Sequence, residues 1–241
     1  MIVMAILIVL AAHSMAHGLD GAALLKKVDA NLQPESFESY RKLINIEPAG
    51  AKREFLLYTL KKGHDRIASL FLSPASEKGR ATLRLGDNMW LYIPNVGKPI
   101  RITSLQSVVG GVFNNADIMR LDYNVEYRVE HVQDGTDEYV LDLKAKNGAV
   151  AYDRLKMRVD KKNTVPTRIE CYAATGLLIK TLYFKEMKPF DDGIPRPSVI
   201  ETDSPLYKGY QSIMVYARVK KRTVADEVFT LEFLPKFESI R

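Results

Sequence analysis

The sequence predicts a mainly β protein with a small helical part (α+β), in which antiparallel strands form a strongly curved sheet or incomplete barrel. Three observations predict this class: apolar and polar residues alternate in many short runs, glycine-containing turns join the runs, and only two segments have helical spacing. Alternation is clearest at Leu141 and Leu143 and at Leu155 and Met157, which are separated by charged residues. One face of these strands is therefore expected to face water.

The chain begins with an uncharged apolar run, Met1 to Ala12, which is too short to cross a bilayer as a helix. Small residues follow at Ser14 and Ala16, at the spacing of a signal-peptidase site. We therefore predict a cleaved secretory signal over residues 1–16 and a single domain over residues 17–241. The run lacks the usual basic residue at its start, and the alternative is that it is kept as an anchor.

The first element expected after the leader is a helix from Gly21 to about Leu32, because Asp20 suits its N-cap and Pro34 ends it. Turn signals then separate a series of β-type runs, and the Pro-rich stretch at residues 188–198 is too short to divide domains. Strands are predicted at residues 40–46, 53–61, 66–72, 81–85, 89–93, 100–103, 125–132, 138–145, 152–160, 166–172, 178–184, 199–202, 213–220 and 229–234.

Residues 81–85 and 89–93 alternate on either side of a turn at Gly86, and we interpret them as a hairpin with one apolar face. An apolar insertion follows at about residues 104–122, interrupted by Gly110-Gly111, which suits either a hinge or a turn. An apolar segment of this size would be a liability in water, so we expect it to fold back onto the sheet as a partly helical lid.

The formal net charge is +6 and the pI about 9.2, with the basic residues spread along the chain. This charge favours weak contact with anionic membrane surfaces, and the lack of a nucleic-acid motif argues against nucleic acid as a partner. Cys171 is the single cysteine, so no internal disulfide forms and no lipidation site follows the leader. An exported, unlipidated chain is expected to be soluble.

No pattern for catalysis, metal binding or cofactor binding is evident. Outside the leader, His64 follows a turn glycine and His131 lies near a strand end, and neither has a ligand or triad partner at a recognised spacing. A nucleophile elbow and a phosphate-binding glycine loop are also missing from the sequence. We therefore predict a protein that is not an enzyme and has no cofactor. The alternative from another class is a lipid hydrolase or isomerase that uses one of these histidines.

The run MWLYIPNVGKPIRI at residues 89–102, together with the GGVF and DIMRLDY sequences of the insertion, resembles the outer-membrane lipoprotein-sorting family of LolA/LolB-like carriers. The resemblance implies an incomplete β-barrel that an N-terminal helix and a helical lid close over an apolar cavity. It also implies an arginine that holds the lid closed. Arg101 lies near the matching region, although its role is left open.

The function implied is that of a periplasmic carrier, which binds acyl chains of lipoproteins or phospholipids and moves them between inner and outer membrane. Membrane-bound donor and acceptor proteins would be its partners. A lipid shuttle for a resistance-nodulation-division exporter and a structural envelope protein are alternatives. Trp90 and Tyr92 are expected at a rim or against an outer helix. The predicted lipid-contacting wall residues are Leu57, Leu70, Leu83, Leu85, Met89, Leu91, Ile93, Leu141, Leu143, Leu155, Met157, Ile169 and Leu182, and the predicted lid residues are Val109, Phe113, Ile118, Met119 and Leu121.

Overall fold

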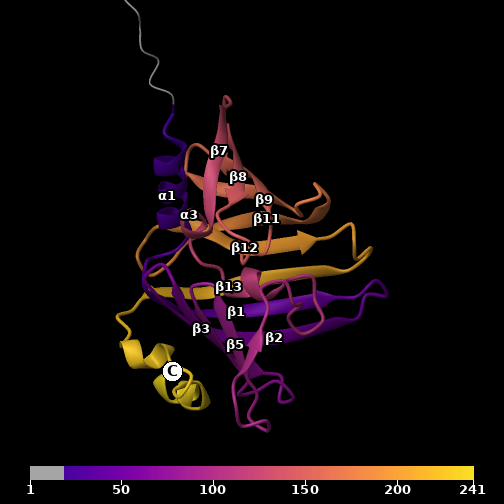
Figure 1. Ribbon diagram of the computed structural model, residues 1–241, viewed down its shortest axis with the longest axis vertical. Helices are drawn as coiled ribbons and strands as arrows, with labels where there is room; N and C mark the ends of the chain where they lie inside the picture. Colours follow the sequence, from indigo (N-terminus) through magenta and orange to yellow (C-terminus); the bar gives the residue numbers. More distant parts are fainter. Residues whose placement is uncertain (1–18) are drawn as a thin grey trace, which may run out of the picture.

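The computed structural model describes residues 19–241, and the signal predicted at residues 1–16 lies outside this range. The described residues form one antiparallel sheet of thirteen strands (Figure 1). The strands are β1 (Phe37–Ile46), β2 (Lys52–Lys62), β3 (Arg66–Ser73), β4 (Ala81–Leu85), β5 (Asn88–Tyr92), β6 (Ile100–Ile102), β7 (Tyr127–Asp134), β8 (Glu138–Ala145), β9 (Arg154–Asp160), β10 (Val165–Tyr172), β11 (Leu178–Pro189), β12 (Pro195–Asp203) and β13 (Gln211–Lys221).

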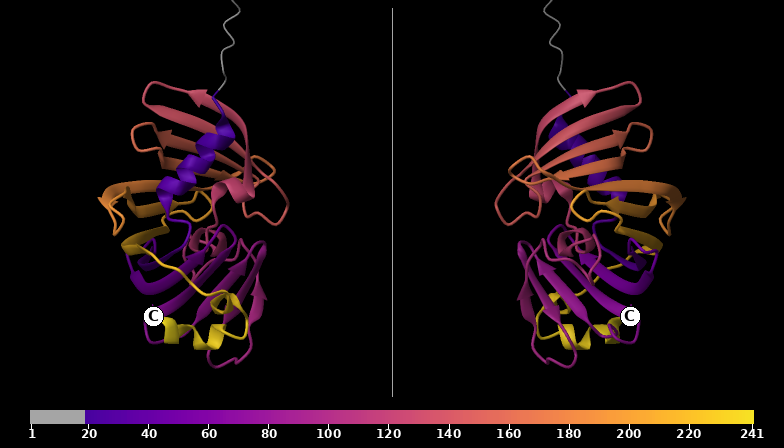
Figure 2. Two further views of the ribbon diagram at one scale, coloured as in Figure 1. Left: turned by 90° about the vertical axis from the view of Figure 1, so that its left-hand side faces the viewer. Right: turned by 90° about the vertical axis from the view of Figure 1, so that its right-hand side faces the viewer.

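Two meanders make up the sheet, and the first and last strands of the chain join them at its centre. The spatial order is β6-β5-β4-β3-β2-β1-β13-β12-β11-β10-β9-β8-β7, so β6 and β7 are its two edges. The sheet curves strongly without closing into a barrel, and its two halves flank a concave side (Figure 2). The predicted fold class, a curved antiparallel sheet with an incomplete barrel, is confirmed.

Helix α1 (Gly21–Leu32) lies across the concave side of the β7–β13 half (Figure 2). Its N-cap is Asp20, whose carboxylate accepts hydrogen bonds from the backbone N–H groups of Ala22 and Ala23 at 3.0 and 3.1 Å. Such a cap satisfies donors that the first helical turn leaves unpaired. The buried face of α1 packs on β7, β10 and β12. No helix within residues 19–241 is both long and apolar enough to span a bilayer.

The lid segment, residues 103–126, connects the two edge strands and lies on the concave side of the sheet. It contains two single-turn helices, α2 (Asn115–Ile118) and α3 (Tyr123–Glu126). Asn114 and Asp117 form a reciprocal capping box at α2, which explains how so short a helix is held. The chain therefore crosses from one sheet edge to the other through this segment.

The outer face of the other half is also covered. After β13 the chain forms the C-terminal strap, residues 222–241, with two 3₁₀ helices, η1 (Asp226–Phe229) and η2 (Leu234–Ile240). These helices pack against β3 and β4. The strap and the sheet bury a second apolar cluster, which is separate from the one on the concave side and consists of Tyr58, Leu60, Ala68, Leu70, Ala81, Leu83, Val224, Val228, Phe229, Leu234 and Phe237.

The strand predicted at residues 229–234 is wrong. Phe229, Leu231 and Phe233 alternate as in a strand, but the segment is a turn between two 3₁₀ helices. Pro235 at the start of η2 has no N–H for a ladder and is compatible with a helix start. Phe229 and Leu234 of this segment, together with Phe237 of η2, are instead buried against the outer face of the sheet.

The single apolar face predicted for the hairpin of β4 and β5 is also wrong. Leu83 pairs with Trp90 and Arg84 pairs with Met89, so Leu83 lies on the outer face and Met89 on the concave face. Leu85, Trp90 and Tyr92 pack against the outer cluster. Trp90 and Tyr92 thus lie on the outer side of the sheet, and their predicted position at a rim or against an outer helix stays a prediction.

We predict that Phe237→Ala destabilises the protein by about 3 to 5 kcal/mol, because it leaves a cavity under the strap where Phe237 is fully buried. Urea denaturation followed by circular dichroism measures this loss. The control is Lys236→Ala in the same helix, since the Lys236 side chain is exposed. Equal free energies of unfolding for both variants would show that the strap does not stabilise the sheet.

Candidate functional site

The candidate site is the interior between the concave side of the sheet, α1 and the lid segment. Buried apolar side chains from all three parts form one continuous cluster there. A small pocket of about 40 Å³ remains within it, between Phe113, Ala116 and Tyr123 of the lid segment and Leu155, Ile169 and Leu182 of the sheet. Ligand pockets are usually about 300 Å³ or larger, so the seated lid segment fills most of the interior.

The structure brings most of the predicted site residues together in this interior. Twelve lie in the concave-side cluster, and Val109 packs against it: Leu57, Met89, Phe113, Ile118, Met119, Leu121, Leu141, Leu143, Leu155, Met157, Ile169 and Leu182. Of the wall residues, Leu91 is buried and Ile93 half-buried, and both lie outside the two clusters. Contact of any of these residues with lipid stays a prediction.

Three predicted wall residues do not line the concave side. Leu70 and Leu83 belong to the outer cluster, and Leu85 packs against it. Their neighbours on the concave face are the polar residues Ser69 and Arg84, which contact Arg41 and the lid segment respectively. These positions were misassigned because both faces of this half of the sheet are buried, each under a different cover.

Two buried arginines of the sheet donate hydrogen bonds to backbone carbonyls of the lid segment. Arg41 on β1 donates to the carbonyl of Ile118 at 2.9 Å, and Arg84 on β4 donates to the carbonyl of Met119 at 3.0 Å. Arg41 also donates to the hydroxyls of Thr59 and Ser69, and Arg84 also donates to the Glu126 carboxylate. The arginines therefore fix the end of α2 to the N-terminal half of the sheet.

Two buried lysines hold the same segment from other strands. Lys61 on β2 pairs with Asp122 just before α3. Lys180 on β11 pairs with Asp117 at 2.8 Å and also donates to the carbonyl of Val112. Both lysine side chains are almost completely buried, a position in which a cation is stable only when it is paired and hydrogen-bonded. We refer to Arg41, Lys61, Arg84 and Lys180 as the latch cations.

Further polar contacts complete this network. The Tyr152 hydroxyl donates to Asp117 at 2.9 Å and accepts from the Asn114 amide at 2.7 Å. Asp29 of α1 accepts from the backbone N–H groups of Tyr123 and Asn124, each at 2.8 Å. Helix α1 and the start of α3 are thereby joined. The lid segment is held by both halves of the sheet and by the N-terminal helix.

The pKa shifts of Asp122 and Cys171 agree with a structural role for these buried groups. Burial alone would raise the pKa of Asp122, but the charge of Lys61 and hydrogen bonds from Lys61 and His64 hold it below its ordinary value. Burial raises the pKa of the Cys171 thiol well above its ordinary value. Cys171 lines the small pocket and stays protonated, so it acts there as a small apolar side chain.

Close packing also fixes the glycine pair of the lid segment. A Cβ added at Gly111 would lie 2.1 Å from Oδ1 of Asn45 on β1, so this position requires the missing side chain. Asn45 donates to the carbonyl of Val109 at 3.3 Å and accepts from Ser212 at 2.7 Å. Gly110 has a positive φ of 72°, which suits a turn.

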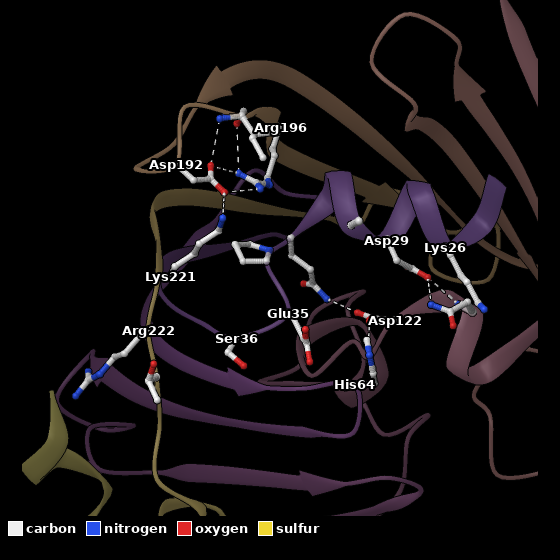
Figure 3. Close-up of a pocket in the computed structure, with 16 residues that line it drawn as sticks. Lys26, Asp29, Glu35, Ser36, His64, Asp122, Asp192, Arg196, Lys221 and Arg222 are labelled. Carbon is white, nitrogen blue, oxygen red and sulfur yellow. Dashed lines mark hydrogen bonds and ion pairs between the residues drawn. The ribbon is translucent and has the colours of Figure 1, made fainter. Parts of the chain in front are cut away.

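A second, larger hollow opens to solvent beside the interior, and we call it the end cleft. It has a volume of about 780 Å³ and is lined by the C-terminal part of α1, the Asp122 region, the hairpin between β11 and β12, and residues 221–223 (Figure 3). His64 lies in it and contacts Asp122 at 2.6 Å. Ser36 also lines the cleft, but its hydroxyl accepts from the backbone N–H of Gly63.

This arrangement does not assemble a recognisable catalytic triad from the described residues. No hydrogen bond joins His64 to Ser36 within residues 19–241, although a nucleophile and its base need such contact. His131 is exposed on the edge strand β7 and lines none of the cavities described above. Across the same residues, no group of three or more metal-ligating side chains gathers.

Sequence reasoning missed the latch cations. Arg101 belongs to the run at residues 89–102 that resembles the LolA/LolB-like family. It is exposed, and its side chain contacts Asn88 and Trp90. Strand alternation does place Arg41 on the same face as Leu43, and Arg84 on the same face as Thr82. That signal gives a shared face for each strand. It does not say that this face is the concave one.

Comparisons with known proteins find one matching family model and several similar solved structures. A protein-family model described only as "Uncharacterized protein" matches residues 63–236. A comparison with curated proteins finds no match. The structure resembles a crystal structure of a LolA superfamily protein from Nitrosomonas europaea, with a TM-score of 0.79 and 28% identity over 88% of this chain and 97% of that one.

Two further crystal structures share the fold at lower identity. A putative outer membrane lipoprotein-sorting protein domain from Vibrio parahaemolyticus has a TM-score of 0.75 and 20% identity, covering 89% of this chain and 98% of its own. A DUF1329 family protein from Desulfovibrio piger has a TM-score of 0.75 and 23% identity, covering 89% and 97%. At these identities the likeness extends to the fold alone.

Proposed function

This chain belongs to the LolA-like superfamily, and from that premise we propose that it is a periplasmic carrier for the acyl chains of lipoproteins or other lipids. Acyl chains would occupy the apolar interior after the lid segment moves, for transfer between the inner and outer membrane. One observation carries the proposal: a continuous apolar interior is covered by a segment that polar side chains hold in place.

The energetics favour a carrier with a movable cover. Burial of methylene groups yields on the order of 0.8 kcal/mol each, so a sixteen-carbon chain gains roughly 12 kcal/mol relative to water before entropy is counted. The pocket of about 40 Å³ is far smaller than such a chain requires. Binding therefore needs displacement of the lid segment, which otherwise covers the apolar interior.

A polar latch suits repeated opening. When the lid segment leaves, the latch cations become accessible to water, and hydration offsets much of the hydrogen bonding that they lose. The apolar lid residues would meanwhile contact the acyl chain in place of the sheet. The free-energy difference between the seated and the displaced lid segment can thus stay small. A carrier needs this small difference in order to load and release its lipid.

We expect the protein, purified from a bacterial periplasm from Gly18 onward, to carry lipid at near one molecule per chain. Native mass spectrometry with lipid extraction detects it, and titration with a fluorescent fatty acid measures binding. A protein that contains no lipid and also rejects the fatty acid would overturn the carrier proposal and favour a structural role in the envelope.

We predict that Phe113→Asp weakens fluorescent fatty-acid binding by roughly tenfold or more, because it places a carboxylate in the apolar interior where Phe113 is buried. Leu105→Asp is the matched control, since Leu105 belongs to the same lid segment but is exposed. Thermal denaturation establishes that both variants fold. A folded Phe113→Asp protein that binds as the wild type does would exclude Phe113 from the site.

We predict that Arg41→Leu raises the apparent affinity for the fatty acid by roughly five- to tenfold. The change removes the donor to the Ile118 carbonyl and so increases the fraction of molecules with a displaced lid segment. Arg101→Leu is the control, because Arg101 is exposed and its side chain donates a hydrogen bond to Asn88 on β5. Equal affinities for the two variants, or weaker binding by Arg41→Leu, would contradict a latch role.

A further inference from the structure

The end cleft is joined to the apolar interior by a chain of shared lining residues. Gln33 and Arg196 line both the cleft and a pocket of about 20 Å³ behind it. That small pocket in turn shares Arg120, Phe184 and Tyr216 with the pocket under the lid segment. The wide polar cleft and the narrow apolar interior are therefore separated by only a few side chains near the end of α1.

The lid segment forms part of this opening. Asp122 lines the cleft and lies directly before α3, and the Gln33 amide donates to it at 3.2 Å. Gln33 is the C-cap residue of α1. Any displacement of the lid segment that moves Asp122 would break this bridge and open a path to the interior, so the cleft lies where a lipid in the interior would reach solvent.

Some charged side chains of the cleft have close ion-pair partners, and others do not. Asp192 holds Arg196 through two hydrogen bonds of 2.6 and 2.7 Å, and Asp122 pairs with Lys61 and is hydrogen-bonded to His64. Lys26 has no ion-pair partner within residues 19–241. Lys221 reaches only Asp192, at 4.0 Å. Figure 3 shows these two lysines on different elements around the same hollow.

Arg196 lies at the junction of cleft and interior and has a buried donor without a partner, as do Arg41, Arg80 and Arg168 elsewhere in residues 19–241. Its side chain is 2% exposed, and its Nε finds no hydrogen-bond partner among the described residues. A buried donor of this kind ordinarily has a partner, since leaving it unpaired costs free energy. An anionic oxygen of a ligand in the cleft would supply one, as guanidinium groups bind phosphate well.

We propose that the end cleft is a head-group site for phospholipid, with Lys26 and Lys221 contacting the phosphate and the acyl chains passing the Gln33 and Arg196 junction into the interior. The inference rests on the proposed carrier function and narrows its cargo. Lipoprotein acyl anchors lack a phosphate, so the unpaired Lys26 and the weakly paired Lys221 favour phospholipid over them.

The test compares two double variants that remove the same charge. Lys26→Gln with Lys221→Gln changes the cleft, whereas Lys27→Gln with Lys220→Gln changes adjacent exposed lysines that do not line it. The probes are phosphatidylglycerol, diacylglycerol with the same acyl chains, and a triacylated lipopeptide, each with a fluorescent acyl label. Because all four lysines are exposed, both variants should fold, which thermal denaturation checks.

We expect the cleft variant to bind phosphatidylglycerol roughly tenfold more weakly than the wild type, with diacylglycerol and lipopeptide binding unchanged. The control variant should bind all three as the wild type does. Equal losses in both variants, no loss in the cleft variant, or an equal loss for lipopeptide would overturn the head-group site. A wild-type protein that binds none of the probes would instead overturn the carrier function itself, on which this site depends.

Discussion

The backbone of the lid segment must satisfy its polar groups inside an apolar interior, and much of the structure depends on this constraint. Residues 112–126 form only two helical turns, so many of their carbonyl groups have no partner within the segment. The strands opposite use their backbone groups for sheet pairing and can offer only side chains. Arg41, Arg84 and Lys180 provide these donors to the carbonyls of Ile118, Met119 and Val112.

The same constraint accounts for the unusual composition of the concave face. Donors that reach into the interior must be long and strongly hydrogen-bonding, which selects arginine and lysine, and their charges then need carboxylates nearby. Glu126, Asp122 and Asp117 lie in the lid segment and meet Arg84, Lys61 and Lys180. Buried ion pairs of this kind add little net stability compared with apolar packing. Their contribution here is to specify where the lid segment sits.

The strands and α1 follow from the sequence because their signals are local. The run from Gly21 to Leu32 has its cap at Asp20, and Arg154 to Asp160 alternates without interruption. The assignment of faces could not follow, because alternation separates Leu83 from Arg84 but does not tell which side is concave. The C-terminal strap makes the outer side apolar and the latch makes the inner side partly polar. Hydrophobicity therefore placed Leu70, Leu83 and Leu85 on the wrong face.

The lid segment connects β6 to β7, so displacement of this segment would not require strand pairing in the sheet to break. These strands are the two edges of the sheet, so the segment joins edges that have no ladder between them. Its displacement would break side-chain contacts with the latch cations and the apolar cluster, while the pairing of β1 with β13 at the centre stays intact. In the proposed carrier, the interior would therefore change volume by movement of one segment. A closed barrel would have to break strand pairing to achieve the same change.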